Sequence, residues 1–259
     1  HKCFEFFWCV WRHFFLEVMA LRFASALHLA VVHARSYSKG YRPIWQRHEE
    51  LTTAIVSPED LMNAPDTIDW SEKGATSPIK NQGPCGSCWA YSTVEGVESA
   101  IFMSRGSLPE ALSTQELVSC DKEDDGCNGG DIETAVTYLQ QHGLSNDTNF
   151  PDVSSKTGDS GLCTWNKMSV VEVKGMQYAI PPCTKSDCAE QDEAALAAAL
   201  AKYGPISICV NAQGWQNYSE GVYNEECSAE LGKVDHCVQL VGYDRTAPEP
   251  YWKLRNSWS

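Results

Sequence analysis

Apolar residues recur at helical spacing at the start of the most regular stretch of the chain. After Cys88 they stand at Ala90, Val94, Val97 and Ile101, which places them on one face of a helix. This pattern predicts a helix that begins at Cys88 and packs one apolar face against a core.

Two more helices are indicated in the same half of the chain. The tetrapeptide STQE at 113–116 has the spacing of a capping box ahead of Leu117 and Val118, so we expect a helix to begin there. Residues 131–141 predict a further helix, which Gly143 ends.

The second half of the chain is richer in strands. Runs of β-branched and aromatic residues bounded by Gly, Pro or Asn predict strands at Ile206–Val210, Val238–Tyr243 and Tyr251–Arg255. The alanine-rich stretch 194–201 is a strong helix former. A helical part followed by a strand-rich part predicts an α+β fold of two lobes with a groove between them.

The chain changes character near residues 64–66, beyond which Gly, Pro and short apolar runs alternate as in a compact domain. We therefore expect one domain over 64–259 and a leader over 1–63. Within the leader, one arginine and a short apolar run ending in small residues indicate a secretory signal near 19–34, with an amphipathic leader helix as the alternative. Residues 35–63 would then be a short pro-region remnant.

Composition limits the partners of the protein. Twenty Lys and Arg stand against 34 Asp and Glu, a formal charge of −14, whereas nucleic-acid binding needs clustered basic residues. No clean apolar run is long enough to span a bilayer, so we expect no nucleic-acid partner and no stable membrane association. The charge favours a monodisperse monomer. Twelve cysteines indicate an oxidising compartment.

The cysteine pair in NQGPCGSCWA at 81–90 permits three interpretations. A structural zinc site needs four ligands, usually from two such pairs, but the only other close pair, Cys183 and Cys188, is more widely spaced. We therefore expect no metal. A thiol–disulfide oxidoreductase would use Cys85 and Cys88 together, which leaves the rest of the chain unexplained.

The third interpretation gives the two cysteines different roles. Cys88 would begin a helix, where unpaired N–H groups and the helix dipole favour a thiolate. Gly83 and Gly86 permit a tight turn before it. Gln82 would offer an amide donor to an oxyanion, and Cys85 would be half of a disulfide that clamps the loop.

A thiolate nucleophile needs a base, and the base needs a group that orients it. Five of the seven histidines precede the domain, and His142 lies at a helix end, where it complements the helix dipole. His236 stands at the start of a predicted strand, where packing is the ordinary role of a histidine. Because Asn256 follows the next strand, we expect the two side by side, with Trp258 covering their hydrogen bond.

Four motifs in order, QGPCGSCWA, SCDKEDDGCNGG, VDHCVQLVGY and RNSW, resemble those of the papain-like cysteine peptidases. A cysteine motif with a distant downstream His and Asn is a known signature of that family. The resemblance covers residues 64–259. It implies a two-lobed papain-like fold, with a helical lobe followed by a β-barrel-like lobe, and a cysteine-type endopeptidase that acts on proteins or peptides without a cofactor.

The resemblance also assigns roles to residues. Cys88 would be the nucleophile, His236 the general base and then acid, and Asn256 the group that orients the imidazole. Gln82 and the Cys88 backbone N–H would form the oxyanion hole. Because a thiolate and an imidazolium stabilise one another, we expect the pKa of Cys88 far below the value of about 8.5 for a free thiol.

By the same resemblance, Gly129 and Gly130 present bare backbone to an extended substrate. The pocket for the second residue before the scissile bond would be lined by Asp131, Ile132, Cys209, Val234 and Cys237. Asp131 would either favour a basic side chain in that pocket or point at solvent.

The resemblance further implies two disulfides that tie the helical lobe together, Cys85 to Cys127 and Cys120 to Cys163. Cys183 and Cys188 would pair locally within an insertion. Cys209 and Cys237 are left with two alternatives, a disulfide in the pocket wall or two buried thiols that act as small hydrophobic groups.

Some features depart from the family. The family's partner for Cys227 lies beyond Ser259, and we expect a domain that is incomplete at its C-terminus. Residues 35–63 are shorter than the family's inhibitory prosegment, which leaves activation from a zymogen open. The resemblance favours a lysosomal, vacuolar or secreted protein. A catalytically silent papain-fold binding protein and a CxxC oxidoreductase remain the competing functions, and the latter would not need His236.

Overall fold

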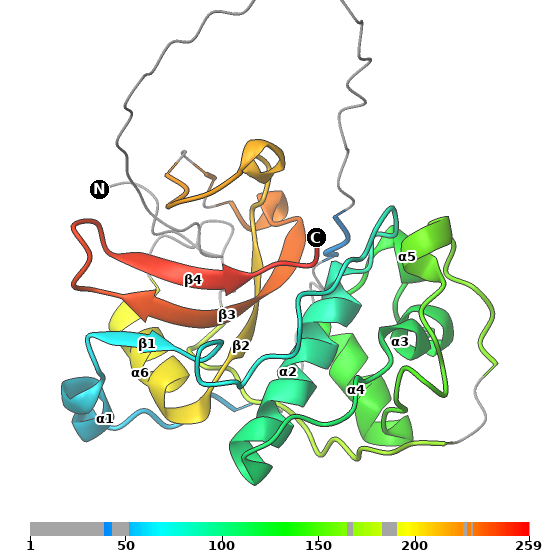
Figure 1. Ribbon diagram of the computed structural model, residues 1–259, viewed down its shortest axis with the longest axis horizontal. Helices are drawn as coiled ribbons and strands as arrows, with labels where there is room; N and C mark the ends of the chain where they lie inside the picture. The colour runs from blue at the N-terminus through cyan, green and yellow to red at the C-terminus, as the bar shows by residue number, and fades with distance from the viewer. Residues whose placement is uncertain are drawn as a thin grey trace, which may run out of the picture.

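The computed structural model describes residues 39–42, 52–164, 168–182, 191–224, 227–228 and 230–258. These residues form two lobes (Figure 1). Helices α2 to α5 make up one lobe, and a β-sheet with helix α6 makes up the other. The expected two-lobed α+β arrangement is confirmed.

Helix α2 (Cys88–Arg105) lies along the junction of the two lobes (Figure 1). Its apolar face carries Ala90 and Val94 into the core of the helical lobe, as the sequence pattern predicts. The side that meets the sheet is polar, and the Ser92 hydroxyl donates a hydrogen bond of 2.8 Å to the Val238 carbonyl. The helix therefore joins the lobes through hydrogen bonds as well as packing.

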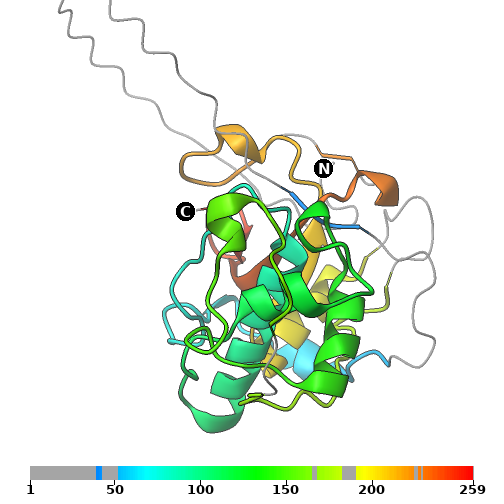
Figure 2. The same cartoon turned by 90° about the vertical axis from the view of Figure 1, so that its right-hand side faces the viewer.

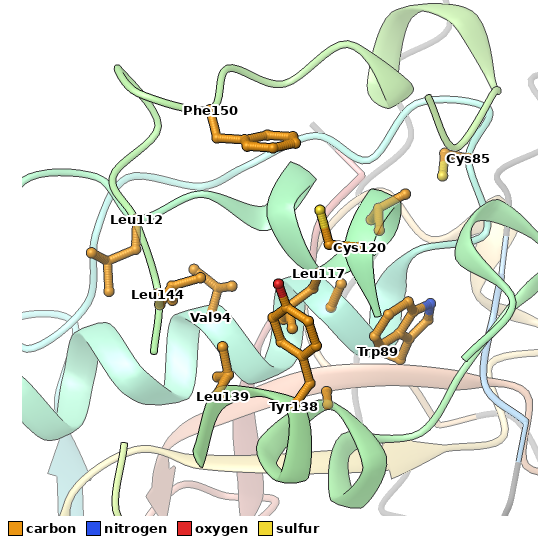
Figure 3. Close-up of a cluster of buried hydrophobic side chains, with 13 residues drawn as sticks. Cys85, Trp89, Val94, Leu112, Leu117, Cys120, Tyr138, Leu139, Leu144 and Phe150 are labelled. Carbon is orange, nitrogen blue, oxygen red and sulfur yellow. The ribbon is translucent and has the colours of Figure 1, made fainter. Parts of the chain in front are cut away.

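The helical lobe is completed by α3 (Thr114–Cys120), η1 (Gly126–Asn128), α4 (Ile132–His142) and α5 (Ser154–Thr157). Figure 2 views the molecule from this lobe, with the sheet behind it. Its core is drawn in Figure 3 and includes Trp89, Leu117, Leu139, Leu144 and Phe150.

The cap of α3 differs from the capping box that the sequence predicts. The Ser113 hydroxyl accepts a hydrogen bond of 3.1 Å from the Glu116 N–H, which is one half of that motif. The Glu116 carboxylate binds the Ser145 N–H at 2.8 Å instead of returning to the start of the helix. The Ser145 N–H lies in a buried loop and has no partner within a helix or strand, so the Glu116 carboxylate accepts its hydrogen bond instead.

The second lobe is built on an antiparallel sheet of β1 (Thr67–Asp69), β2 (Ile206–Val210), β3 (His236–Asp244) and β4 (Tyr251–Arg255). Strand β3 pairs with each of the other three. Strands β2 and β4 have the predicted bounds, whereas β3 begins two residues earlier and ends one residue later than expected.

Four short elements complete the lobe: α1 (Pro58–Asn63), α6 (Glu193–Tyr203), η2 (Trp215–Asn217) and η3 (Leu231–Lys233). Helix α6, predicted from its alanine-rich sequence, buries Leu196 and Leu200 in the same core as Ile208 of β2 and Leu240 of β3. The sheet is thereby covered on this side.

The pairing register of the strands brings His236, Cys209 and Cys237 to one end of the sheet. Val210 lies opposite His236, and Cys209 lies opposite Cys237. Asn256 follows directly after β4, which pairs with β3. His236 and Asn256 therefore meet at the junction of the lobes.

Three disulfides are present among the described residues: Cys85–Cys127, Cys120–Cys163 and Cys209–Cys237. The first two are those that the resemblance implies. The third decides between the alternatives for Cys209 and Cys237 in favour of the covalent pair. Cys183 and Cys188 lie outside the described residues. No helix within the described ranges has the length and apolar character needed to cross a bilayer.

Candidate active site

The loop before α2 places Cys88 at the first position of that helix. The Cys85–Cys127 disulfide fixes the loop, and the Gly86 N–H donates a hydrogen bond of 2.9 Å to the Cys127 carbonyl. Cys88 itself is wholly buried and is not part of a disulfide. The Cys88 sulfur therefore lies at the N-terminus of a helix whose preceding loop is fixed by a disulfide and by a backbone hydrogen bond.

Burial controls the ionisation of Cys88 in this arrangement. It raises the pKa of the thiol to about 12, although backbone N–H groups of Cys237, Gly40 and Trp89 hydrogen-bond the sulfur and act in the opposite direction. The direction in this arrangement is the opposite of the lowered pKa that the thiolate–imidazolium pair leads us to expect. A buried thiolate lacks the hydration that it would have in water, and three backbone N–H groups do not make up for that loss.

His236 is also fully buried, and one ring nitrogen has a clear partner. Its Nε2 lies 2.8 Å from Asn256 Oδ1, and the Ser257 N–H donates to the same oxygen at 2.8 Å. Because that oxygen accepts, Nε2 carries the proton of the neutral ring. Nδ1 has no hydrogen-bond partner in the described part of the chain and is left with its lone pair.

Two tryptophans surround the imidazole. Trp258 stacks on His236 with ring centroids 4.4 Å apart, as the sequence suggested. Trp215 of η2 meets the ring edge-on at 6.3 Å, a contact that sequence reasoning missed because η2 is about 20 residues away. Burial lowers the pKa of His236 to about 4, against the opposing effects of Asn256 and Asp235.

Gln82 is held rigidly beside the Cys88 loop. Its Nε2 donates to the Cys85 carbonyl at 2.9 Å, and its Oε1 accepts from the Ser257 hydroxyl at 2.6 Å. Ser257 therefore connects Gln82 to Asn256, since its backbone N–H binds Asn256. No local pattern around Ser257 indicates this role, because it depends on how Gln82 and Asn256 come together in the fold.

Residues 39–42 cross the groove between the lobes, in the blue segment above the start of α2 in Figure 1. The Gly130 N–H donates to the Gly40 carbonyl at 2.9 Å, and the Arg42 N–H donates to the Gly130 carbonyl at 2.9 Å. On the opposite wall, the Tyr41 N–H binds the Asp235 carbonyl at 3.2 Å. Both lobes thus hold the segment.

Two glycines make this crossing possible. A Cβ on Gly40 would lie 1.8 Å from the Gly86 carbonyl oxygen, so no other residue fits this close to the Cys88 loop. A Cβ on Gly130 would lie 2.6 Å from the Asp124 carboxylate and 2.7 Å from the Trp89 ring. The absence of a side chain at Gly130 is therefore required by the packing of Asp124 and Trp89, and it also leaves the Gly130 backbone open to pair with segment 39–42.

The Tyr41 side chain fills a pocket beside Cys88. It belongs to a buried cluster with Cys88, Cys209, Leu231, Val234 and Cys237, against which the partly buried Ile132 packs. Four of the five predicted pocket residues are among them, and Leu231 is an addition from η3. A cavity of about 160 Å³ continues from Tyr41, Ile132 and Cys209 toward α6 and β2.

The fifth predicted pocket residue is Asp131. It is buried, and its carboxylate accepts a hydrogen bond of 3.0 Å from the Glu133 N–H as the N-cap of α4. It does not point at solvent, because the first turn of a helix offers unpaired N–H groups to a carboxylate at that position.

Comparison with known proteins identifies relatives over most of the chain. A family model described as papain family cysteine protease matches residues 64–259. A cysteine proteinase of Trypanosoma brucei brucei is 38% identical over 199 residues, which are 76% of this chain and 41% of the relative. Cysteine proteinase 1 of Zea mays is 37% identical over 228 residues, 81% of this chain and 56% of the relative. The chain spans about half the length of these curated relatives.

Solved structures give the same similarity at the level of the fold. A recombinant stem bromelain precursor superposes with a TM-score of 0.71 and 27% identity. The match covers 87% of this chain and 67% of that one. The two lobes described above are thus arranged as in that structure.

Proposed function

Because the chain belongs to the papain family of cysteine proteases, we propose that it is a cysteine-type endopeptidase with Cys88 as its nucleophile. One observation carries the proposal: the strand that begins with His236 lies against the thiol, since the next N–H along it, that of Cys237, hydrogen-bonds the Cys88 sulfur. We assign the role of base to the unprotonated Nδ1 of His236, the residue that precedes Cys237 in that strand.

The reaction uses the groups in a fixed order. His236 Nδ1 takes the thiol proton, and the Cys88 sulfur attacks the peptide carbonyl carbon. The negative oxygen that results is stabilised by Gln82 Nε2 and the Cys88 N–H. The imidazolium returns its proton to the leaving amine, and water, deprotonated by the same nitrogen, releases the acyl group. Asn256 keeps Nε2 protonated throughout, so that Nδ1 faces the sulfur.

We further propose that the described arrangement is a self-blocked precursor. Tyr41 occupies the pocket and Gly40 lies over Cys88, so no peptide has room to approach the thiol. Their presence also excludes water from Cys88, which favours the neutral form of its thiol here. Departure of residues 39–42 would hydrate the pair and let it ionise.

The cysteine pattern supports a compartment that allows disulfides, such as a lysosome, vacuole or the extracellular space. It also argues against the oxidoreductase alternative. Such an enzyme would join Cys85 to Cys88, whereas Cys85 is bonded to Cys127. Proteins and peptides are the proposed substrates.

The test is hydrolysis of a fluorogenic peptide with an apolar residue second from the scissile bond, by chain freed of residues 1–63. The variants are Cys88→Ser and His236→Ala, with His142→Ala as the matched control at a helix end. We expect activity in the parent and the control only. Activity that persists in Cys88→Ser, or none in a folded parent across a peptide panel, would overturn the proposal in favour of another nucleophile or a binding protein.

A further inference from the structure

The Cys209–Cys237 disulfide differs from the other two in where it lies. Cys85 and Cys120 belong to the core of the helical lobe. Cys209 and Cys237 instead face one another across β2 and β3 and belong to the cluster around Tyr41. This disulfide is therefore part of the groove.

It also lies next to the reacting groups. Cys237 directly follows His236 in β3, and its N–H hydrogen-bonds the Cys88 sulfur. Cys209 lines the cavity that continues behind Tyr41. A change in this disulfide therefore alters the contacts of the side chain that occupies the pocket.

The same cluster shields the bond from solvent. Cys209 is 5% exposed and Cys237 is 1% exposed while Tyr41 is in place. Apart from Tyr41, every member of the cluster comes from the two lobes themselves. Thiol–disulfide exchange requires a thiolate to reach one of the sulfurs. Departure of residues 39–42 therefore opens the pocket side of this disulfide.

We propose that the Cys209–Cys237 disulfide is a redox-modifiable wall of the substrate pocket. While the bond is intact, the pocket prefers aromatic side chains of the substrate, and reduction of the bond shifts this preference toward smaller side chains. The inference rests on the proposed function and deepens it. Segment 39–42 protects the bond in the precursor, and its loss makes the bond accessible to dithiols. The pocket's selectivity then depends on the redox state of its surroundings.

The chemistry of the wall gives the direction of the change. Bonded sulfurs provide a polarisable surface for an aromatic ring, and the ring of Tyr41 already packs there. When a dithiol reduces the bond, it supplies two electrons and two protons and is itself oxidised to a cyclic disulfide. The two resulting thiols require a full non-bonded separation, and the sheet behind them is closely packed. A sulfur is therefore displaced into the pocket, which leaves less room for a ring.

The first experiment follows the bond itself. The chain of residues 1–259 and its Tyr41→Ala variant are treated with graded dithiothreitol, then alkylated and analysed by peptide mass spectrometry. We expect labelling of Cys209 and Cys237 at least about tenfold faster in the variant, because access sets the exchange rate. Labelling of Cys120 and Cys163 in the same samples is the internal control. Equal rates for Cys209 and Cys237 in both proteins would overturn the protective role of Tyr41.

The second experiment measures selectivity without catalysis. A Gly40→Ala/Tyr41→Ala/Cys88→Ala variant is titrated with peptides that carry Phe, Leu or Ala at the pocket position, before and after reduction. The change at Gly40 is included because a Cβ there would lie 1.8 Å from the Gly86 carbonyl oxygen and so drive segment 39–42 from the groove. The preference for Phe over Leu should fall about 2- to 10-fold on reduction, the range that one sulfur–aromatic contact provides. A further Cys209→Ala/Cys237→Ala change should abolish the response, whereas Cys120→Ala/Cys163→Ala should preserve it.

An unchanged preference after complete reduction would show that the disulfide only joins two strands, and would overturn the proposal. Failure of every peptide to bind would overturn it as well, because no pocket would exist. Neither result depends on hydrolysis, which is judged separately by the assay of the parent chain. The hydrolysis assay therefore tests the proposed peptidase activity, and the binding assay tests the role of the disulfide, independently of one another.

Discussion

Glu95 is a carboxylate whose burial makes the stability of the protein depend on pH. It lies wholly buried on α2 at the junction of the lobes, with Arg255 Nη2 3.4 Å from one of its oxygens. Burial raises the pKa of Glu95 from 4.5 to about 7, and the attraction of Arg255 and Lys80 does not offset it. Arg255 has other partners, since it also donates to Gln239 at 3.2 Å.

The sign of the effect follows from proton binding. Below pH 4.5 the folded and unfolded chains both hold the proton on Glu95. Between pH 4.5 and about 7 the folded chain keeps a proton that the unfolded chain releases, so stability falls as pH rises through this window. At 1.36 kcal/mol for each pH unit, the loss amounts to about 3 kcal/mol, a large part of the stability of a small domain.

The perturbation is Glu95→Gln, which keeps the shape and removes the titration. Urea unfolding measured from pH 4 to pH 8 should show the parent losing about 3 kcal/mol relative to the variant across that window. Groups that titrate in both proteins, such as His236, cancel in this difference. Glu110→Gln, at an exposed carboxylate, is the matched control and should follow the parent. Parallel curves for the parent and Glu95→Gln would refute the reasoning.

Three further predictions concern the groove and the core. Gly40→Ala should drive segment 39–42 from the groove and speed iodoacetamide labelling of Cys88 by at least about tenfold at pH 6; unchanged labelling would mean that the segment does not cover the thiol. Asn256→Ala should lower kcat/KM by about 100-fold with little change in KM, since His236 loses its orienting acceptor; a loss confined to KM would contradict this. Leu139→Ala, in the core of the helical lobe, should cost about 2–5 kcal/mol in urea unfolding, and a cost below about 1 kcal/mol would show that the cavity collapses.

Local sequence patterns predicted the elements that carry the site. The bounds of β2 and β4 follow from short β-branched runs between turn residues, and α2 begins at Cys88 as its apolar spacing indicates. The pairing of His236 with Asn256 could be expected because both lie at the ends of neighbouring strands. Trp215 and Ser257 were not found, because their contacts with the site depend on how distant segments pack.

The sequence by itself determined that Cys88 begins a helix and that His236 and Asn256 stand at the ends of neighbouring strands, because helix starts and strand ends are encoded in short stretches of chain. Tertiary structure alone decided three things. It decided that Cys209 and Cys237 are bonded, since only the register of β2 on β3 brings them opposite one another. It decided that Tyr41 fills the pocket, through contacts that join residues nearly 200 positions apart. It also decided that burial raises the pKa of Cys88, because that pKa depends on the water that the packed chain excludes.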